Sequence, residues 1–387
     1  MIKGSATKQG TMNYAEKYPL LSYKPLVPSG MYISGAGFGC YRVDVRVPEH
    51  QQALTKALLS GINLIDTSAN YADGGSERLV GKVIGDLVAG GKIKREEVVV
   101  VSKVGYLQGE NYSLSQECKK AGRPFKDLVL YDKRLEHCIH PEFLAEQLTM
   151  SLERLNLEMI DCYLLHNPEY YLNWAKQHKV AKATARSEYL RRIRIAFLHL
   201  EKEVAAGRIQ YYGISSNTFP RPMNNFDFTS LADIWNIARS ISPEHHFRVI
   251  QFPLNLLETA GVTEKNQPVG KSLVEFAVNK GIGILTNRPL NAIREGDLIR
   301  LSENVYQGDA IQQVNEFKKQ IAALDQSWGI VPTLSQLALR VLRSTTGVTA
   351  VLMGMRRDVY IDDVIYELSK PCETVGRGEI WEKISAL

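Results

Sequence analysis

Short runs of apolar and β-branched residues alternate along the chain with longer stretches in which apolar residues recur at helical spacing. The runs have the length of buried strands, and the stretches between them predict amphipathic helices. Eight strands are predicted, at 33–39, 62–67, 98–103, 160–166, 210–215, 248–252, 283–286 and 349–353. This alternation is typical of parallel βαβ units.

The intervening helices show the same pattern. They are predicted at 49–60, 76–89, 141–156, 191–206, 231–238 and 271–280, and several of them close on glycine. Two further helices, 311–328 and 333–343, precede the last strand. A barrel needs only one helix there, so we expect one of the two to be additional.

Eight strands alternating with helices predict a single α/β domain, a closed (β/α)₈ TIM barrel. No Gly-x-Gly-x-x-Gly turn follows the first strand, which disfavours the alternative, a doubly wound dinucleotide-binding sheet. No linker of low complexity divides the chain. We therefore predict a barrel domain over 20–370, with an N-terminal extension at 1–19 and a C-terminal tail at 371–387.

Three stretches are too long for plain connectors: 106–140, 167–191 and 220–246. They follow the third, fourth and fifth predicted strands. Loops in these positions lie over the C-terminal face of a barrel, where active sites are built. We expect their aromatic residues to help form a substrate pocket.

Composition narrows the class of protein. The net charge of +5 is small for 387 residues, and it does not favour nucleic acid as a partner. The five cysteines are an odd number without a CxxC pair, which disfavours a disulfide framework or a zinc site and favours a reducing, cytoplasmic compartment. No apolar stretch is long enough to span a membrane, and residues 1–17 lack a secretion signal.

Three successive predicted strands lead into ionisable residues. The second ends at Asp66 and continues to Tyr71, the third ends at Lys103 and the fourth at His166. Strand ends converge at one mouth of a barrel, so we expect these four side chains to meet. Taken alone, each has a structural interpretation, such as a helix cap or a half-buried polar residue, and it is the convergence that favours catalysis.

The four residue types suit the reduction of a carbonyl group. Free tyrosine has a pKa of about 10, and an ammonium group beside it lowers that value. Lys103 would supply this charge to Tyr71, Asp66 would pair with Lys103, and His166 would orient a substrate oxygen. The hydride must come from a cofactor, because no protein side chain donates one.

Four longer motifs surround these residues: the run Gly61-Ile62-Asn63-Leu64-Ile65-Asp66-Thr67-Ser68 with Tyr71, Ser76-Glu77-Arg78-Leu79-Val80-Gly81, Gly213-Ile214-Ser215-Ser216-Asn217, and Gly354-Met355-Arg356-Arg357. Together they are the basis of a resemblance to the aldo-keto reductase superfamily. It covers about 23–364 and places Asp66, Tyr71, Lys103 and His166 in the catalytic positions of the superfamily. It implies a TIM barrel that binds a nicotinamide cofactor.

The same resemblance implies the cofactor contacts. Ser215, Ser216 or Asn217, together with Gln251, would hold the nicotinamide carboxamide. Arg356 and Arg357 follow the last strand, where a 2′-phosphate would bind, which favours NADP (NADPH) over NAD. The remaining contacts are predicted at Gly39, Arg288, Leu290, Gly354 and Asp363. The chain departs from the superfamily at Val364, where asparagine is common, and at Asn287, where many members carry an aromatic ring that stacks on the nicotinamide.

The predicted function is reversible reduction of an aldehyde, ketone or sugar aldehyde, with Tyr71 as general acid and base and no metal. Two alternatives remain open. The turn Tyr71-Ala72-Asp73-Gly74-Gly75-Ser76-Glu77 resembles members that oxidise a sugar at C1, and the superfamily also includes non-catalytic subunits that keep the cofactor. The oligomeric state is not predicted.

Overall fold

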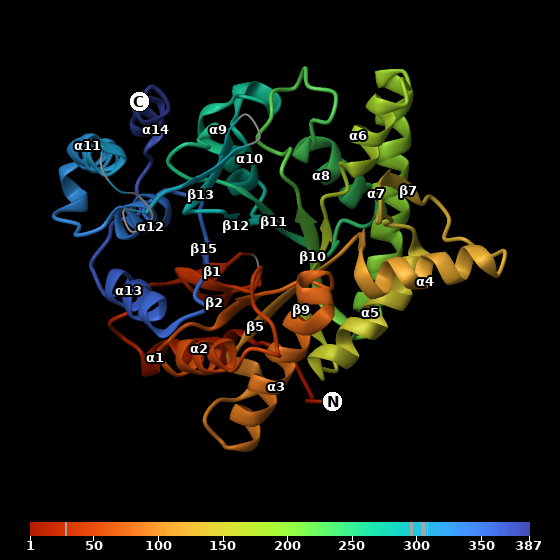
Figure 1. Cartoon of the computed structure of the whole chain (residues 1–387), viewed down its shortest axis with the longest axis horizontal. Coiled ribbons are helices and arrows are strands. Elements are labelled where there is room, and N and C mark those ends of the chain that lie inside the picture. Colours follow the sequence, from red (N-terminus) through yellow and green to blue (C-terminus); the bar gives the residue numbers. More distant parts are fainter. Residues whose placement is uncertain (28, 295–296, 303–306, 308) are drawn as a thin grey trace.

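The computed structural model describes residues 1–27, 29–294, 297–302, 307 and 309–387. Eight parallel strands close into a barrel in the order β10-β11-β12-β15-β3-β4-β5-β9 (Figure 1). They are β3 (Ala36–Gly39), β4 (Leu64–Asp66), β5 (Val99–Val104), β9 (Ile160–His166), β10 (Ile209–Ser215), β11 (Phe247–Pro253), β12 (Gly283–Asn287) and β15 (Ala350–Met353). The predicted TIM barrel is confirmed, and the doubly wound alternative is wrong because β15 pairs with β3 and closes the sheet.

The first predicted strand, 33–39, is two strands. Gly35 separates β3 from β2 (Met31–Ser34), which forms an antiparallel hairpin with β1 (Tyr23–Leu26). Leu26, Met31 and Ile33 join the cluster of side chains inside the barrel, so the hairpin plugs one end of it. Gly283 leaves room for this plug, because a Cβ there would overlap the side chain of Leu26.

Side chains alternate between the two faces of the barrel wall, as strands require. Leu64, Val101, Leu164, Val249 and Leu285 belong to the inner cluster. Their sequence neighbours pack outward against the helices and form the larger cluster. This parity determines which residue at the end of each strand faces the mouth.

Helices surround the barrel. The predicted ones are α2 (Pro48–Leu59), α3 (Gly75–Ala89), α5 (Pro141–Leu155), α7 (Lys182–Ala205), α8 (Leu231–Ile241), α10 (Leu273–Asn279), α11 (Asp309–Ala323) and α12 (Leu334–Arg343). α12 contacts β15 and α13 (Asp358–Leu368), so α12 is the barrel helix and α11 is the additional one. The predicted helix 311–328 ends early, and a separate 3₁₀ turn covers Gln326–Trp328.

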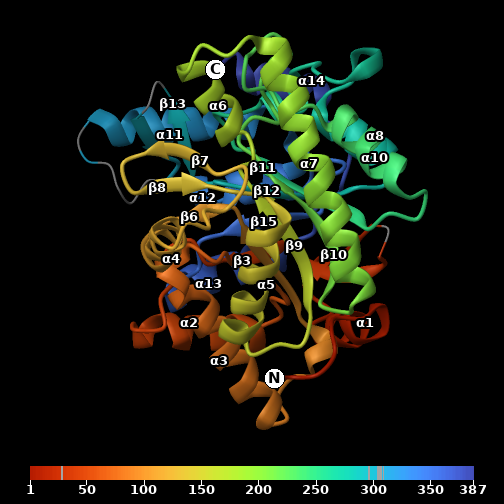
Figure 2. The same ribbon diagram turned by 90° about the vertical axis from the view of Figure 1, so that its right-hand side faces the viewer.

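The three long stretches contain elements of their own. The first folds as β6 (Tyr106–Leu107), α4 (Gly109–Lys120), β7 (Val129–Asp132) and β8 (Leu135–His137), and its strands form a separate antiparallel sheet beside α4 (Figure 2). The second holds α6 (Tyr170–Gln177), and the third holds α8. A further insertion that the sequence pattern did not predict, β13 (Asn291–Arg294) with β14 (Asp297–Arg300), follows β12.

The remaining elements lie at the periphery. α1 (Lys8–Lys17) contacts β2, and α14 (Gly378–Ser385) contacts α9 (Ala260–Thr263). The two termini lie at opposite ends of the molecule in both views (Figures 1 and 2).

All five cysteines are free thiols. Within the ranges described above, none of the helices has the length and apolarity to cross a membrane.

Candidate active site

Most barrel strands carry a polar inward-facing residue at or near their C-terminal end. Asp66, Lys103, His166, Ser215, Gln251 and Asn287 follow the inner apolar residues at even spacing along β4, β5, β9, β10, β11 and β12. The register supports this layer, because Ser215 lies opposite both His166 and Gln251. Parity and register therefore gather one polar side chain from each of six strands at one mouth.

Lys103 is fully buried and lies at the centre of this layer. Its Nζ donates to Asp66 Oδ2 at 2.7 Å, to the Thr67 carbonyl at 2.9 Å and to the Tyr71 hydroxyl at 3.4 Å. Burial lowers the pKa of Lys103, but Asp66 and Tyr71 outweigh that effect and raise it above its ordinary value. Lys103 is therefore an ammonium ion at neutral pH.

Tyr71 projects from a tight turn after β4, in which Ala72 and Asp73 have φ of 49° and 55°. Its pKa is raised above the ordinary value because burial outweighs the opposing effect of Lys103. Lys103 lowers the pKa of Tyr71, as expected, but the expectation that this pKa is lowered overall is wrong. Tyr71 thus keeps its proton through the neutral range, as a general acid must.

His166 lies beside Tyr71, with ring centroids 6.0 Å apart in an edge-on arrangement. Burial, Lys103 and His137 lower its pKa well below the usual value, so the ring is neutral. Its Nδ1 is 3.2 Å from Ser68 Oγ. Ser68 was not among the predicted site residues, although it stands in the same motif as Asp66.

Gln251 joins the predicted cofactor contacts to the catalytic group. Its Nε2 donates to Asp66 Oδ1 at 2.8 Å, while its Oε1 accepts from Ser215 Oγ at 3.0 Å and from Asn287 Nδ2 at 3.3 Å. Sequence alone did not predict these links, because they join strands far apart in the chain.

The segment after β10 takes part through its backbone and through its hydroxyl groups. The Asn217 N–H donates to Glu169 Oε1 at 2.9 Å, and Ser216 Oγ lies 3.2 Å from Thr218 Oγ1. Glu169 is 2% exposed, and burial raises its pKa to about 7. This buried carboxyl was not predicted, since nothing in the sequence marks it apart from its position three residues after His166.

The other predicted cofactor residues lie around the same mouth. Gly39 ends β3, Gly354 follows β15, and a Cβ added at Gly354 would meet open space. Arg288 has a φ of 55° and pairs with Glu258 at 2.6 Å. The carbonyl of Leu290 accepts from the Leu301 N–H at 2.8 Å, which fixes the start of the β13–β14 insertion.

Arg356 and Arg357 immediately precede α13, and Arg357 is its N-cap residue. Neither guanidinium makes an ion pair with any residue that the structure describes. Two cations at a helix N-terminus suit a phosphate group. Asp363 lies further along α13, where it accepts from Gln336 Nε2 at 2.5 Å.

The first insertion forms a wall beside His166. His137 Nε2 lies 2.8 Å from the His166 carbonyl oxygen, and burial lowers the pKa of His137 to about 4. The Tyr106 ring contacts the rings of His166, His137 and Tyr170 with centroids 4.7, 5.7 and 5.1 Å apart. Tyr106 and Tyr170 are therefore close to the site, as expected for the long stretches.

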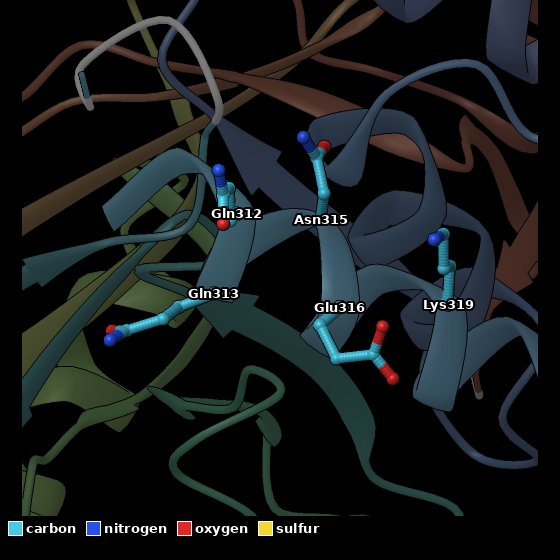
Figure 3. A pocket seen from close by; sticks show the side chains of 5 residues that line it. All are labelled: Gln312, Gln313, Asn315, Glu316 and Lys319. Carbon is cyan, nitrogen blue, oxygen red and sulfur yellow. The ribbon is translucent and has the colours of Figure 1, made fainter. Parts of the chain in front are cut away.

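Two hollows lie outside this layer. One, of about 550 Å³, lies among β7, α6 and the segment after β10, and Tyr131, Asn173, Lys176, Gln177, Arg221 and Asp227 line it. The other is lined only by residues of α11, whose side chains point in different directions and do not converge (Figure 3).

In the described part of the chain, no cluster of three or more His, Cys, Asp or Glu residues has the arrangement of a metal site.

Comparison with known proteins agrees with the barrel and its motifs. The model of the aldo/keto reductase family matches residues 37–374. An NADH-specific methylglyoxal reductase of Escherichia coli is 36% identical over 106 residues, which is 27% of this chain and 27% of that protein. An NAD(P)H-dependent D-xylose reductase of Scheffersomyces stipitis is 24% identical over 265 residues, which is 66% of this chain and 64% of that protein. These matches thus span less than two thirds of the relatives' own lengths.

Among solved structures, the aldo-keto reductase AKR11C1 of Bacillus halodurans, in its holo form, aligns with a TM-score of 0.59 at 17% sequence identity. The alignment covers 94% of this chain and 96% of that one. At this level of identity, the likeness shows that the two chains share a fold.

Proposed function

The chain belongs to the aldo/keto reductase family, and from that premise we propose that it is an NAD(P)-dependent oxidoreductase that interconverts a carbonyl compound and an alcohol. One observation carries the proposal: the buried Lys103 ammonium lies 3.4 Å from the hydroxyl of Tyr71 and 2.7 Å from Asp66. The reductase names of the relatives support the same reaction class.

A reduced nicotinamide, when bound, supplies a hydride to the carbonyl carbon. The oxygen then carries the electron pair of the C=O bond, and Tyr71 gives it a proton. Lys103 stabilises the resulting phenolate, and Asp66 holds Lys103 in place and charged. In the direction of oxidation, Tyr71 takes the proton back.

His166 contributes without changing its charge. Because its pKa is lowered well below the usual range, the ring stays neutral and offers one N–H. A neutral donor beside Tyr71 orients the substrate oxygen without competing as an acid. Tyr106 and the insertion that carries it restrict the approach of water on this side.

The residues present fit a nicotinamide cofactor. Ser215, Gln251 and Asn287 place amide and hydroxyl groups in one layer with Asp66, as a carboxamide requires. Arg356 and Arg357 at the start of α13 suit a 2′-phosphate, which favours NADPH over NADH. The free thiols agree with the predicted cytoplasmic location.

The test is a spectrophotometric screen of NADPH and NADH against aldehydes, ketones and sugars. We expect turnover with at least one carbonyl compound, and we expect Tyr71→Phe to bind the cofactor while losing about 10²–10⁴-fold in kcat. Cofactor binding without any turnover would support the non-catalytic alternative. Unchanged kcat in Tyr71→Phe would remove Tyr71 from the mechanism.

A second candidate reaction is oxidation of a sugar at C1, which the resemblance of the turn 71–77 favours. The open polar hollow of about 550 Å³ beside α6 lies outside the catalytic layer, and its Tyr131 is linked to His166 through the rings of Tyr170 and Tyr106, so the hollow would hold the end of a sugar remote from C1. Its amides, its cations and the Tyr131 ring suit a polyhydroxylated ligand. Under this hypothesis, Asn173→Ala raises the KM for an active sugar several-fold and leaves the KM for methylglyoxal unchanged. Equal changes in the two KM values would show that the hollow does not recognise the sugar.

A further inference from the structure

Asn287 stands where the family resemblance implies an aromatic ring, and its surroundings suggest a different role. It ends β12 in phase with the inner residue Leu285, so its side chain belongs to the polar layer of the mouth. An amide has no aromatic face on which a nicotinamide ring would stack. It has one acceptor and two donors.

The orientation of the Asn287 amide follows from its neighbours. Asp66 carries only acceptor oxygens, so the Gln251 group that lies 2.8 Å from it must be the Nε2 donor. Gln251 Oε1 therefore faces Asn287, and the Asn287 atom 3.3 Å from it must be the Nδ2 donor. The remaining atom of that amide is its oxygen.

This Oδ1 is buried, and no residue in the described part of the chain donates a hydrogen bond to it. Buried amide oxygens are normally paired, so an unpaired one in a ligand-binding layer indicates that a ligand supplies the donor. The neighbouring acceptor is already used, because Gln251 Oε1 accepts from both Ser215 and Asn287. Asn287 Oδ1 therefore remains available to accept a hydrogen bond.

We propose that Asn287 Oδ1 accepts a hydrogen bond from the NH₂ group of the nicotinamide carboxamide and so fixes the ring by its edge. This inference rests on the proposed function. It makes Asn287 a cofactor-positioning residue, whereas the resemblance assigns the carboxamide to Gln251 and the segment 215–217. The carboxamide is the matching group, since it carries donor hydrogens on the same side chain as its carbonyl acceptor.

The test compares two nucleotides by isothermal titration calorimetry, without substrate. One is NADP⁺, and the other is its 3-acetylpyridine analogue, in which a methyl group replaces the carboxamide NH₂. We expect the protein to bind NADP⁺ about tenfold more tightly than the analogue, as for one hydrogen bond. Asn287→Leu should lose that factor for NADP⁺ and keep the affinity for the analogue.

Two further variants complete the design. Asn287→Ala removes the same oxygen with a smaller side chain, and we expect it to lose the same discrimination if Asn287→Leu fails to fold. Thr286→Val is the matched control, because Thr286 is the buried neighbour on β12 that faces the opposite side of the wall. It should keep the full discrimination.

Full discrimination in both Asn287 variants would overturn the inference and assign the NH₂ group to another acceptor. Equal binding of the two nucleotides by the unaltered protein would overturn it as well. These results differ from failure of the proposed function, in which the unaltered protein either binds neither NADP⁺ nor NAD⁺ or binds one of them without turning over any carbonyl compound.

Discussion

At the scale of single residues, burial has a larger effect than neighbouring charge on several groups at the mouth. Tyr71 keeps a raised pKa although Lys103 lies beside it, and His166 stays neutral. Glu169 is the extreme case among the carboxyl groups here, because one oxygen accepts from the Asn217 N–H and the other is buried without a partner in the described structure.

The raised pKa of Glu169 predicts that the free energy of unfolding depends on pH. Its folded pKa of about 7 lies above the ordinary value of 4.5, so the folded state favours the protonated carboxyl. Its stabilising contribution is therefore complete below about pH 4.5, and it is lost as the pH rises through about 7. The loss is on the order of 3 kcal/mol, from about 1.4 kcal/mol per pKa unit.

Glu169→Gln imitates the protonated form and removes this dependence. We expect the variant and the unaltered protein to have similar free energies of unfolding near pH 4.5, and the variant to be more stable by up to about 3 kcal/mol at about pH 8. Urea unfolding at both pH values measures the difference in free energy of unfolding between the two proteins. The contributions of the other titrating groups cancel in this difference. A difference that does not change with pH would contradict the assignment.

The sequence predicted the four ionisable residues of the mouth because each stands at or just after a strand end, where the topology alone brings side chains together. It did not predict the links through Gln251 and Asn287, since these depend on which strands become neighbours and on side-chain orientation. It also gave the wrong net direction for Tyr71, because the extent of burial is a property of the folded chain.

At the scale of elements, the insertion after β5 is attached to the turn that carries Tyr71. Asp73 Oδ1 accepts from the Glu110 N–H at 3.0 Å, and Asn70 Nδ2 donates to Gln108 Oε1 at 3.2 Å. Gly109 lies between these contacts with a φ of 52°, and a Cβ there would overlap the Asp73 carboxylate. The sequence predicted a long stretch over the mouth, but the strands of the insertion, of two to four residues each, are too short to predict from pattern alone.

Gly109→Ala therefore tests whether this attachment positions Tyr71. We expect a loss of about 1–2 kcal/mol from the left-handed backbone, and in addition a several-fold fall in kcat, because the overlap displaces Asp73. Gly122→Ala is the matched control at the other end of α4. Its φ of 68° gives the same backbone strain, but a Cβ there meets no atom within 4 Å. If both variants lose activity equally, the contact with Asp73 has no role in catalysis.

At the scale of the whole molecule, closure of the barrel brings the two halves of the chain together at one mouth, where we propose that the cofactor binds. β15 pairs with β3, with Met353 opposite Phe38, so Gly354 and the two arginines before α13 follow a strand adjacent to that of Gly39. The strand pattern predicted this closure. It did not predict the β1–β2 plug, because its short run of apolar residues is continuous with the next strand.

Because the predicted contacts come from both halves, cofactor binding should stabilise the entire barrel. A ligand at 100 times its Kd adds about 2.7 kcal/mol to the free energy of unfolding, and a thermal unfolding scan measures this as a rise in Tm. At equal concentrations, we expect NADPH to raise Tm more than NADH does, since Arg356 and Arg357 suit the additional phosphate.

Arg356→Ala with Arg357→Ala should bring the NADPH shift down to that of NADH, while the NADH shift stays unchanged. Arg78→Ala removes one positive charge from an exposed position on α3 and should alter neither shift. Equal shifts for both nucleotides in the unaltered protein would argue against a 2′-phosphate site at the start of α13.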